Sequence, residues 1–221
     1  MPAPEKSRIV VLHLTKFSDH GVVLHTIDSL GGRRSYLVRG LKRGSAVAAF
    51  HPLNILDIYS SQSPKSSMAF LREWEPVSQM PGLRGDMAKR SVAMFLSEVL
   101  YRSFTSEMAD EALFQWLCEA VLLLDGAPGS VANFHLWFLA GYAVKLGFMP
   151  GETVEPQGLF DPRGDTPFHR LLESPFEDAM AIPLSSERRR DFSRSMLRYL
   201  SWHLGVNIEA RSLEVLHEVL G

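Results

Sequence analysis

Positive charge gathers in one short stretch of the sequence, residues 31–45, which contains no acidic residue. Its basic residues are Arg33, Arg34, Arg39, Lys42 and Arg43. Guanidinium and ammonium groups spaced along an extended chain can contact successive phosphates of a nucleic acid, and an aromatic side chain among them can stack on a base. Tyr36 has the position for that role. The alternative is a plain hairpin with a solvated basic face, and this stretch alone does not decide between the two.

The elements around this stretch should hold its charges on a strand and a loop. Gly31 and Gly32 are typical of a tight turn that needs a positive φ angle. In the strand that follows, alternation puts Tyr36 and Val38 on one face and Arg39 on the other. Lys42 and Arg43 then fall in a loop that is flanked by glycines.

Strand patterns fill the first 80 residues. Apolar or alternating segments at residues 8–14, 22–27, 35–39, 52–59 and 68–75 are separated by turn-forming residues. Five short strands predict a small antiparallel barrel, and the OB-fold is a five-stranded barrel that commonly binds oligonucleotides. An SH3-like barrel or an open meander has the same strand count.

Helical periodicity replaces the strand pattern after residue 80. Apolar residues recur at helical spacing over residues 88–100, 113–124, 131–146, 187–204 and 210–220. Asp110 or Glu111 is expected to precede the second helix and Ser130 to cap the third. The predicted class is therefore α+β, with an OB-fold barrel over residues 1–80 and an all-helical domain over residues 81–221 packed on it.

Charge is divided unevenly between these two parts. Residues 1–80 contain ten basic and six acidic residues, whereas residues 81–221 contain thirteen basic and nineteen acidic ones. The segment from Ser29 to Arg72 contains seven basic residues and a single acidic residue, Asp57. A basic barrel on an acidic helical part suggests an anionic partner for the barrel.

Two further basic groups lie in the helical part. Lys89 and Arg90 begin the first helix, beside the expected junction with the barrel, and could extend a DNA-binding surface. Arg190, Arg194 and Arg198 recur every four residues on a later helix, next to Arg188 and Arg189. Such a stripe is usually a solvated face; its functional alternatives are an extended nucleic-acid surface or a dock for an acidic peptide.

Catalytic signatures are missing from the sequence. It has no phosphate-binding glycine loop, no nucleophile elbow and no H-E-x-x-H motif, and its single cysteine, Cys118, cannot build a cysteine-based zinc site. Asp161, Asp165 and His169 lie close together in a long loop, where a nuclease or hydrolase site is conceivable, although Asp and Gly in loops usually set turns. We therefore expect no enzyme, no cofactor and no bound metal.

The composition also bears on the compartment. No apolar run approaches the roughly 18 residues that a membrane span needs, and the first residues lead into a strand rather than a signal peptide. A single cysteine fits a reducing environment. We expect a cytoplasmic, nucleoid-associated protein without a membrane partner.

Several segments, taken in order, resemble the bacterial DNA repair family RecO. They are residues 9–26, the run Gly32-Arg-Arg-Ser-Tyr-Leu-Val-Arg-Gly-Leu-Lys-Arg, and residues 50–58, 83–89 and 137–148. No segment is a catalytic signature, but together they cover nearly the whole chain. Many members of the family carry a four-cysteine zinc site after the third helix, and residues 149–165 of this chain contain no cysteine. The resemblance therefore implies the fold without the zinc.

The resemblance implies a recombination mediator. Such proteins bind single- and double-stranded DNA, anneal complementary strands, contact the acidic tail of single-strand-binding protein, and act with RecR to load RecA. The basic residues of the barrel would match the DNA contacts of the family. The competing interpretation is a helical protein-interaction module whose barrel binds a protein, and the two differ in how steeply binding should weaken with salt.

Overall fold

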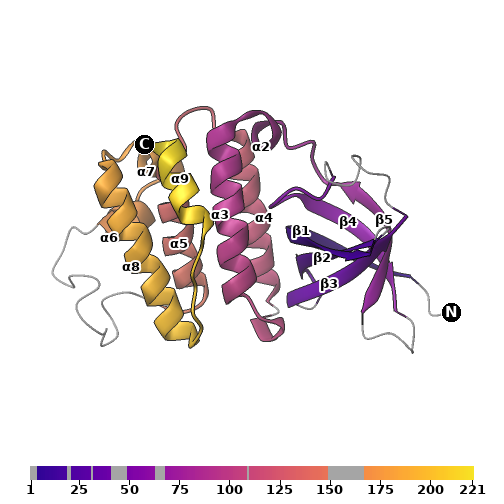
Figure 1. Cartoon of the computed structure of the whole chain (residues 1–221). Coiled ribbons are helices and arrows are strands. Elements are labelled where there is room, and N and C mark those ends of the chain that lie inside the picture. The colour runs from indigo at the N-terminus through magenta and orange to yellow at the C-terminus, as the bar shows by residue number, and fades with distance from the viewer. Residues whose placement is uncertain are drawn as a thin grey trace.

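A closed barrel of five strands forms the N-terminal part of the molecule (Figure 1). This computed structural model describes residues 4–18, 21–30, 32–40, 49–62, 68–108, 110–148 and 167–221. The strands are β1 (Glu5–Ser18), β2 (Gly21–Asp28), β3 (Gly32–Arg39), β4 (Ile55–Ser61) and β5 (Ala69–Pro76). They follow one another around the barrel as β1-β2-β3-β5-β4, with β4 closing on β1. The predicted OB-fold barrel is confirmed, except that β3 and β5 pair in parallel.

Strand β1 closes the barrel because it is long enough to pair on both sides. Its first half pairs with β4 and most of its length pairs with β2, so that Ile9 has partners in both neighbours. Register shifts after Val11 and Lys16 mark bulges, which bend a strand. One continuous strand can therefore turn from one side of the barrel to the other.

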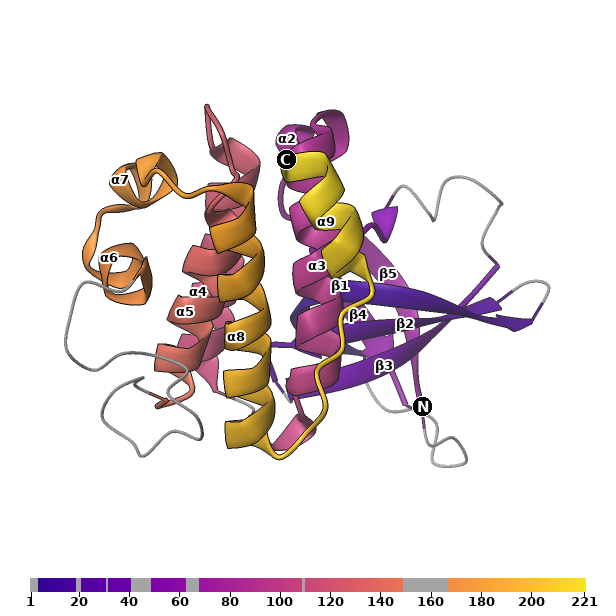
Figure 2. The same ribbon diagram turned by 60° about the vertical axis from the view of Figure 1, so that its left-hand side comes forward.

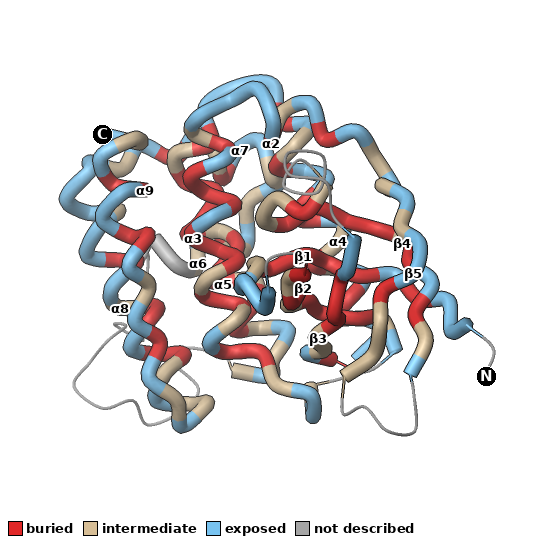
Figure 3. Tube along the Cα trace, turned by 45° about the vertical axis from the view of Figure 1, so that its right-hand side comes forward, coloured by how far each residue is buried: buried red, intermediate tan, exposed pale blue. Residues whose placement is uncertain are grey.

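Both faces of the central part of β1 are buried, which explains why residues 9–12 of this strand form an uninterrupted apolar run. Ile9 and Val11 point into the barrel, whereas Val10 and Leu12 belong to the core that the barrel shares with the helices. Ile27 of β2 and Ile55 of β4 join them there. Figure 3 shows buried backbone running from these strands into the adjacent helices.

The helices stack away from the barrel in a layered array (Figures 1 and 2). They are α2 (Pro81–Gly85), α3 (Met87–Ser103), the 3-10 helix η1 (Ser106–Met108), α4 (Glu111–Gly126), α5 (Phe134–Lys145), α6 (Pro167–Glu173), α7 (Phe176–Ala181), α8 (Ser186–Leu204) and α9 (Ser212–Leu220). Helices α3 and α4 lie next to the barrel, and α8 lies on the far side of the array. The switch from strands to helices thus falls where it was predicted, while a domain boundary at residue 80 stays a prediction.

Side-chain caps explain where two of these helices begin. Asp86 accepts hydrogen bonds from the amides of Ala88 and Lys89 at the start of α3, and Asp110 accepts one from Leu113 at the start of α4. The prediction that Ser130 caps the third helix is wrong. Residues 131–134 form a turn, and α5 begins only at Phe134.

A glycine fixes the contact between the barrel and the helical part. Gly32 has a φ of +64°, as predicted for the turn before β3, and Gly31 lies outside the described residues. A Cβ atom on Gly32 would approach the carbonyl oxygens of Thr105 and Ser106 to 2.8 and 2.9 Å. Only glycine therefore allows β3 to start directly against η1.

Acid should destabilise the fold through His135. This side chain is fully buried in α5, 3.0 Å from the Ser193 hydroxyl, and burial lowers its pKa to about 3. The unfolded chain takes up a proton near the ordinary pKa of about 6.5, so it binds more protons than the folded chain below that pH. Stability should fall by about 2 kcal/mol between pH 7.5 and pH 5 from this group alone. Urea midpoints at the two pH values measure the loss, and His135→Asn should reduce it; an equal loss in the variant would contradict the assignment.

Candidate nucleic-acid interface

The outer face of β3 carries the side chains that a ligand can reach. Tyr36 and Val38 point into the barrel core, so the alternate residues Arg33, Ser35, Leu37 and Arg39 point outward. We call these four outward residues the β3 row. Six residue steps along a strand span about 20 Å. The predicted alternation is confirmed.

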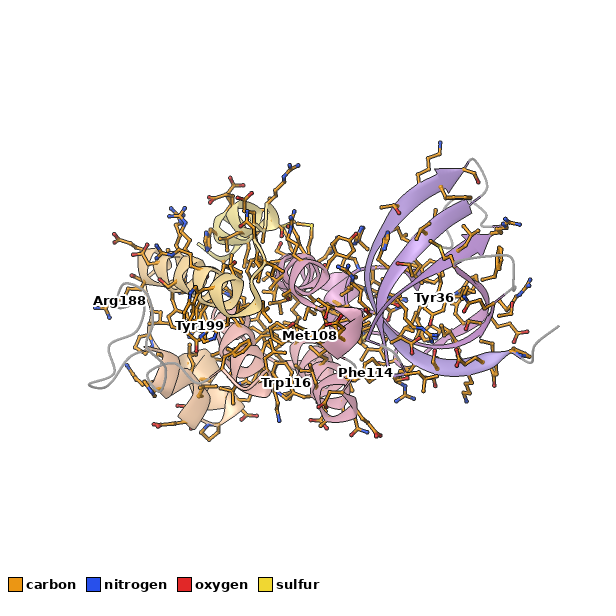
Figure 4. The ribbon with its side chains drawn as sticks, turned by 90° about the horizontal axis from the view of Figure 1, so that it is seen from below. Tyr36, Met108, Phe114, Trp116, Arg188 and Tyr199 are labelled. Atoms are coloured by element: carbon orange, nitrogen blue, oxygen red, sulfur yellow. The ribbon has the colours of Figure 1, made fainter. Side chains whose placement is uncertain are left out.

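Tyr36 cannot stack on a base, contrary to the prediction. It is only 1% exposed, and Figure 4 places it within the barrel. Its hydroxyl donates a hydrogen bond to the carboxylate of Asp28, which also accepts one from Ser7 at 2.9 Å. Burial raises the pKa of the Tyr36 hydroxyl, with Asp28 adding to the effect. The ring is a structural part of the barrel core.

A different aromatic residue occupies the exposed end of the β3 row. Phe70 of β5 pairs with Leu37 of β3, which brings it beside Arg39. The guanidinium of Arg39 lies 4.9 Å from the centre of the Phe70 ring, and that of Arg72 lies 5.7 Å from it. Neither Phe70 nor Arg72 was predicted from the sequence as a site residue. An aromatic ring with two cations close to it is typical of surfaces that bind single-stranded nucleic acid, and we call Arg39, Phe70 and Arg72 the platform.

These two arginines have no acidic partner in the part of the chain that the structure describes. Arg72 donates through Nε to the Ser61 hydroxyl at 2.7 Å, which orients it without neutralising it. Two other arginines of the barrel are paired with carboxylates. Arg8 binds Asp57 through two atoms at 2.7 and 3.1 Å, and Arg34 lies 3.2 Å from Glu5. Of the predicted arginines, Arg34 is therefore the least available to a phosphate.

The other end of the β3 row meets the helices. Arg33 is exposed, donates to the backbone carbonyl of Tyr101 at 2.6 Å, and lies over the ring of that tyrosine at 5.2 Å. Arg33 and Arg39 thus lie exposed at the two ends of the β3 row, and the partly buried Ser35 and the buried Leu37 lie between them. Lys42 and Arg43, which were predicted to continue it, lie outside the described residues.

Lys89 is not part of a DNA-binding surface, contrary to the prediction. It is 6% exposed, and its ammonium group donates to the carbonyl oxygens of Asp125 and Ala127 at 2.7 and 2.6 Å. These carbonyls are at the C-terminal end of α4, where backbone acceptors lack partners within the helix. Its neighbour Arg90 is exposed, but it lies on α3 and donates to the carbonyl of Arg84.

The predicted arginine stripe lies on α8 and borders a groove. The groove has a volume of about 950 Å3 and lies between α8 and the segment that leads into α9. Arg194, Arg198 and Arg211 line it together with Trp202, which is 48% exposed. Arg194 also pairs with Glu214 at 3.3 Å. Figure 4 shows Arg188 at the outer edge of the helical part.

Comparison with known proteins decides the family. Residues 84–154 match the family described as Recombination protein O C terminal. A DNA repair protein RecO of Porphyromonas gingivalis is 30% identical, and the alignment covers 90% of this chain and 91% of that protein. The chain belongs to the RecO family. A DNA repair protein RecO of Flavobacterium psychrophilum is 28% identical, with 97% of this chain and 98% of that protein aligned.

Membership of the RecO family confirms the predicted resemblance and places the chain in a DNA repair and recombination family of non-enzymatic proteins. Asp161 and Asp165 of the alternative enzymatic loop lie outside the described residues, and His169 lies in α6. Within the described ranges no three His, Cys, Asp or Glu side chains gather as a metal site, and no helix is long and apolar enough to span a membrane. The absence of zinc stays a prediction, because most of residues 149–167 is not described.

Lys89 should contribute to the stability of the folded protein and not to its affinity for DNA. Replacing it by methionine leaves two carbonyls at the end of α4 without a donor, which should lower the free energy of unfolding by about 1–3 kcal/mol. Urea denaturation measures this loss, and the affinity for single-stranded DNA of the folded variant should equal that of the wild type. Arg90→Met is the matched control and should change stability by less than about 0.5 kcal/mol. A Lys89→Met variant of normal stability that lost DNA affinity would return this residue to the interface.

Proposed function

We propose that this RecO-family chain is a DNA-binding recombination mediator whose DNA path follows the outer face of β3 and β5. The observation that carries the proposal is that the guanidinium groups of Arg39 and Arg72 lie 4.9 and 5.7 Å from the centre of the Phe70 ring. A base can stack on or beside the ring while the guanidinium N–H groups bind the flanking phosphates. Neither contact reads a base edge, so binding should be nearly independent of sequence.

The same surface accounts for a role in annealing. Neutralised phosphates repel each other less, so a basic surface that holds two strands speeds their pairing without a covalent step or a nucleotide cofactor. We propose that the chain binds single- and double-stranded DNA in this way in the cytoplasm, at the nucleoid. Contacts with RecR and with single-strand-binding protein, and through them the loading of RecA, belong to the same proposal and rest on family membership.

Reversing two charges at the platform should remove most DNA binding. The double variant Arg39→Glu/Arg72→Glu should bind a labelled single-stranded oligonucleotide at least about tenfold more weakly in anisotropy titrations. If the wild type neutralises about four to six phosphates, its log–log salt slope should be near −3 to −4, from roughly −0.7 for each phosphate. The slope of the variant should be shallower, because fewer phosphates are neutralised.

A matched control carries the same change of net charge elsewhere. Arg84→Glu/Lys145→Glu alters two exposed residues of the helical part and should retain affinity within about twofold. The wild type, but not the platform variant, should also accelerate annealing at low salt without ATP or a divalent metal, and leave both strands intact. A platform variant that binds like the wild type would exclude this surface, and strand cleavage would place the chain among enzymes.

The groove on α8 supports a second candidate function, the docking of a protein. Its apolar lining, which includes Leu197, Ile208 and Leu213, lies beside the guanidinium groups of Arg198 and Arg211. A short peptide with both carboxylates and apolar side chains fits this combination. We propose the acidic tail of single-strand-binding protein as the occupant, in keeping with the partner predicted for the family.

Trp202 makes the docking proposal measurable. A tail peptide bound in the groove should change the fluorescence of this exposed indole, and Arg198→Glu/Arg211→Glu should weaken peptide binding at least about tenfold through like-charge repulsion. The same variant should retain single-stranded DNA binding at the barrel. A scrambled peptide of equal charge serves as the control. Equal affinity for both peptides, or for both proteins, would remove the groove as the docking site.

A further inference from the structure

Two histidines and a tyrosine form a ring cluster where the outer face of the barrel meets α3. His13 of β1 and His25 of β2 are stacked, with ring centres 4.4 Å apart and planes 20° apart. The Tyr101 ring of α3 stands perpendicular to His13 at 4.1 Å. All three side chains are partly exposed. Arg33, the first member of the β3 row, lies over the Tyr101 ring at 5.2 Å.

The two imidazoles have different surroundings. His25 is locked, because one ring nitrogen is 3.0 Å from the Thr15 hydroxyl and the other is 2.9 Å from the Ser35 hydroxyl. His13 makes ring contacts but no hydrogen bond within the described part of the chain. Of the five N–H groups of Arg33, only one on Nη1 is used, by the Tyr101 carbonyl. Within the cluster, His13 and Arg33 are therefore the residues that can still donate hydrogen bonds to a ligand.

The charges around the cluster favour an incoming anion. Burial and then the charge of Arg33 lower the pKa of His13; burial, His13 and Arg33 lower that of His25 to about 4. Within the described residues, the charged and titratable groups that face the two imidazoles are each other, Arg33 from β3 and Tyr101 from α3, and no carboxylate acts on either ring. Apolar residues such as Leu12 and Ile27 pack the neighbouring part of this junction. A phosphate beside Arg33 would offset the part of this effect that comes from the charge of Arg33, and would favour a protonated His13.

We propose that His13, His25, Tyr101 and Arg33 form a subsite for one nucleotide of single-stranded DNA, with the base against the rings and its phosphate between Arg33 and His13. The proposal rests on the proposed function, since the β3 row links this subsite to the platform at Phe70 about 20 Å away. The proposal adds His13, His25 and Tyr101 to the DNA interface, three residues that a search for basic side chains would not find. His25 positions His13, and His13 touches the ligand.

The phosphate should draw a proton onto His13 when DNA binds. Because a protonated imidazole is stabilised by a phosphate, affinity should rise as the pH falls from 8 to 6, by up to about tenfold for each unit by which DNA raises the pKa of His13. Three proteins separate the effects in anisotropy titrations with a twelve-nucleotide oligothymidine. The wild type should show the pH dependence. His13→Phe keeps a ring for the base but has no titratable nitrogen, so it should lose the pH dependence and bind more tightly than His13→Ala, which should lose at least about fivefold at both pH values.

A measurement on the wild-type protein tests the proposal even if the variants do not fold. The NMR signal of the His13 ring should titrate at a higher pH in the presence of the oligonucleotide, whereas that of His217 in α9 should not move. If all His13 variants bind like the wild type and its titration is unchanged, the proposal is wrong and the cluster only packs α3 on the barrel. Loss of binding in Arg39→Glu/Arg72→Glu would then show that the proposed function survives without the subsite. Normal binding in every variant would overturn both.

Discussion

Burial of β1 on both of its faces is the constraint on which the arrangement of the molecule depends. Val10 and Leu12 point out of the barrel, and leaving two such side chains in water would cost about 3–6 kcal/mol. Both belong to the core shared with the helices, of which α3 packs against β1. No residue of β3 or β5 belongs to the core that the barrel shares with the helices. The packing that stabilises the fold therefore also leaves uncovered the side of the barrel on which the DNA path is proposed.

This division explains why counting charges along the sequence overstates the binding surface. Arg8 and Arg34 carry the same charge as Arg39, but each forms an ion pair with a carboxylate of the barrel. The hydrogen bond from Arg8 lowers the pKa of Asp57, so this pair remains ionised over the physiological range. Arg39 and Arg72 instead make cation–π contacts with the ring of Phe70. Such a contact orients a guanidinium group while leaving N–H groups available to a phosphate.

The sequence predicts the elements of this fold well and the site only in part. Periodicity locates the strands and the long helices, because it records which side of each element is buried. The short helices α2, α6 and α7 were missed, since five to seven residues contain too few turns to show a period. The alternation of side chains along the strand correctly placed Tyr36 and Arg39 on opposite faces. It could not tell which of the two faces is the inside of the barrel, because that depends on pairing around the whole closed sheet.

The remaining errors come from contacts between residues far apart in the sequence. Phe70 reaches Arg39 only through the parallel pairing of β3 with β5, and a register of two pairs leaves no local pattern. Lys89 looks like a surface charge in its own helix. Its role appears only when the end of α4, 36 to 38 residues later, is brought beside it. A basic residue is thus assigned to a ligand or to the fold by the backbone carbonyls around it, which sequence does not reveal.

The shared core has a consequence for how a mediator can work. The β3 row contacts η1 and Tyr101 at one end and pairs with β5 at the other. Its arginines should therefore lose little conformational freedom when they bind a DNA strand. Since barrel and helices are packed through one core, a partner in the α8 groove and DNA on the barrel would be held at a nearly fixed separation. Such a linkage raises the effective concentration of one ligand near the other without any conformational switch. Bringing a DNA-bound protein and bare DNA together in this way requires a rigid body with two separate surfaces, which is what burial of β1 on both faces provides.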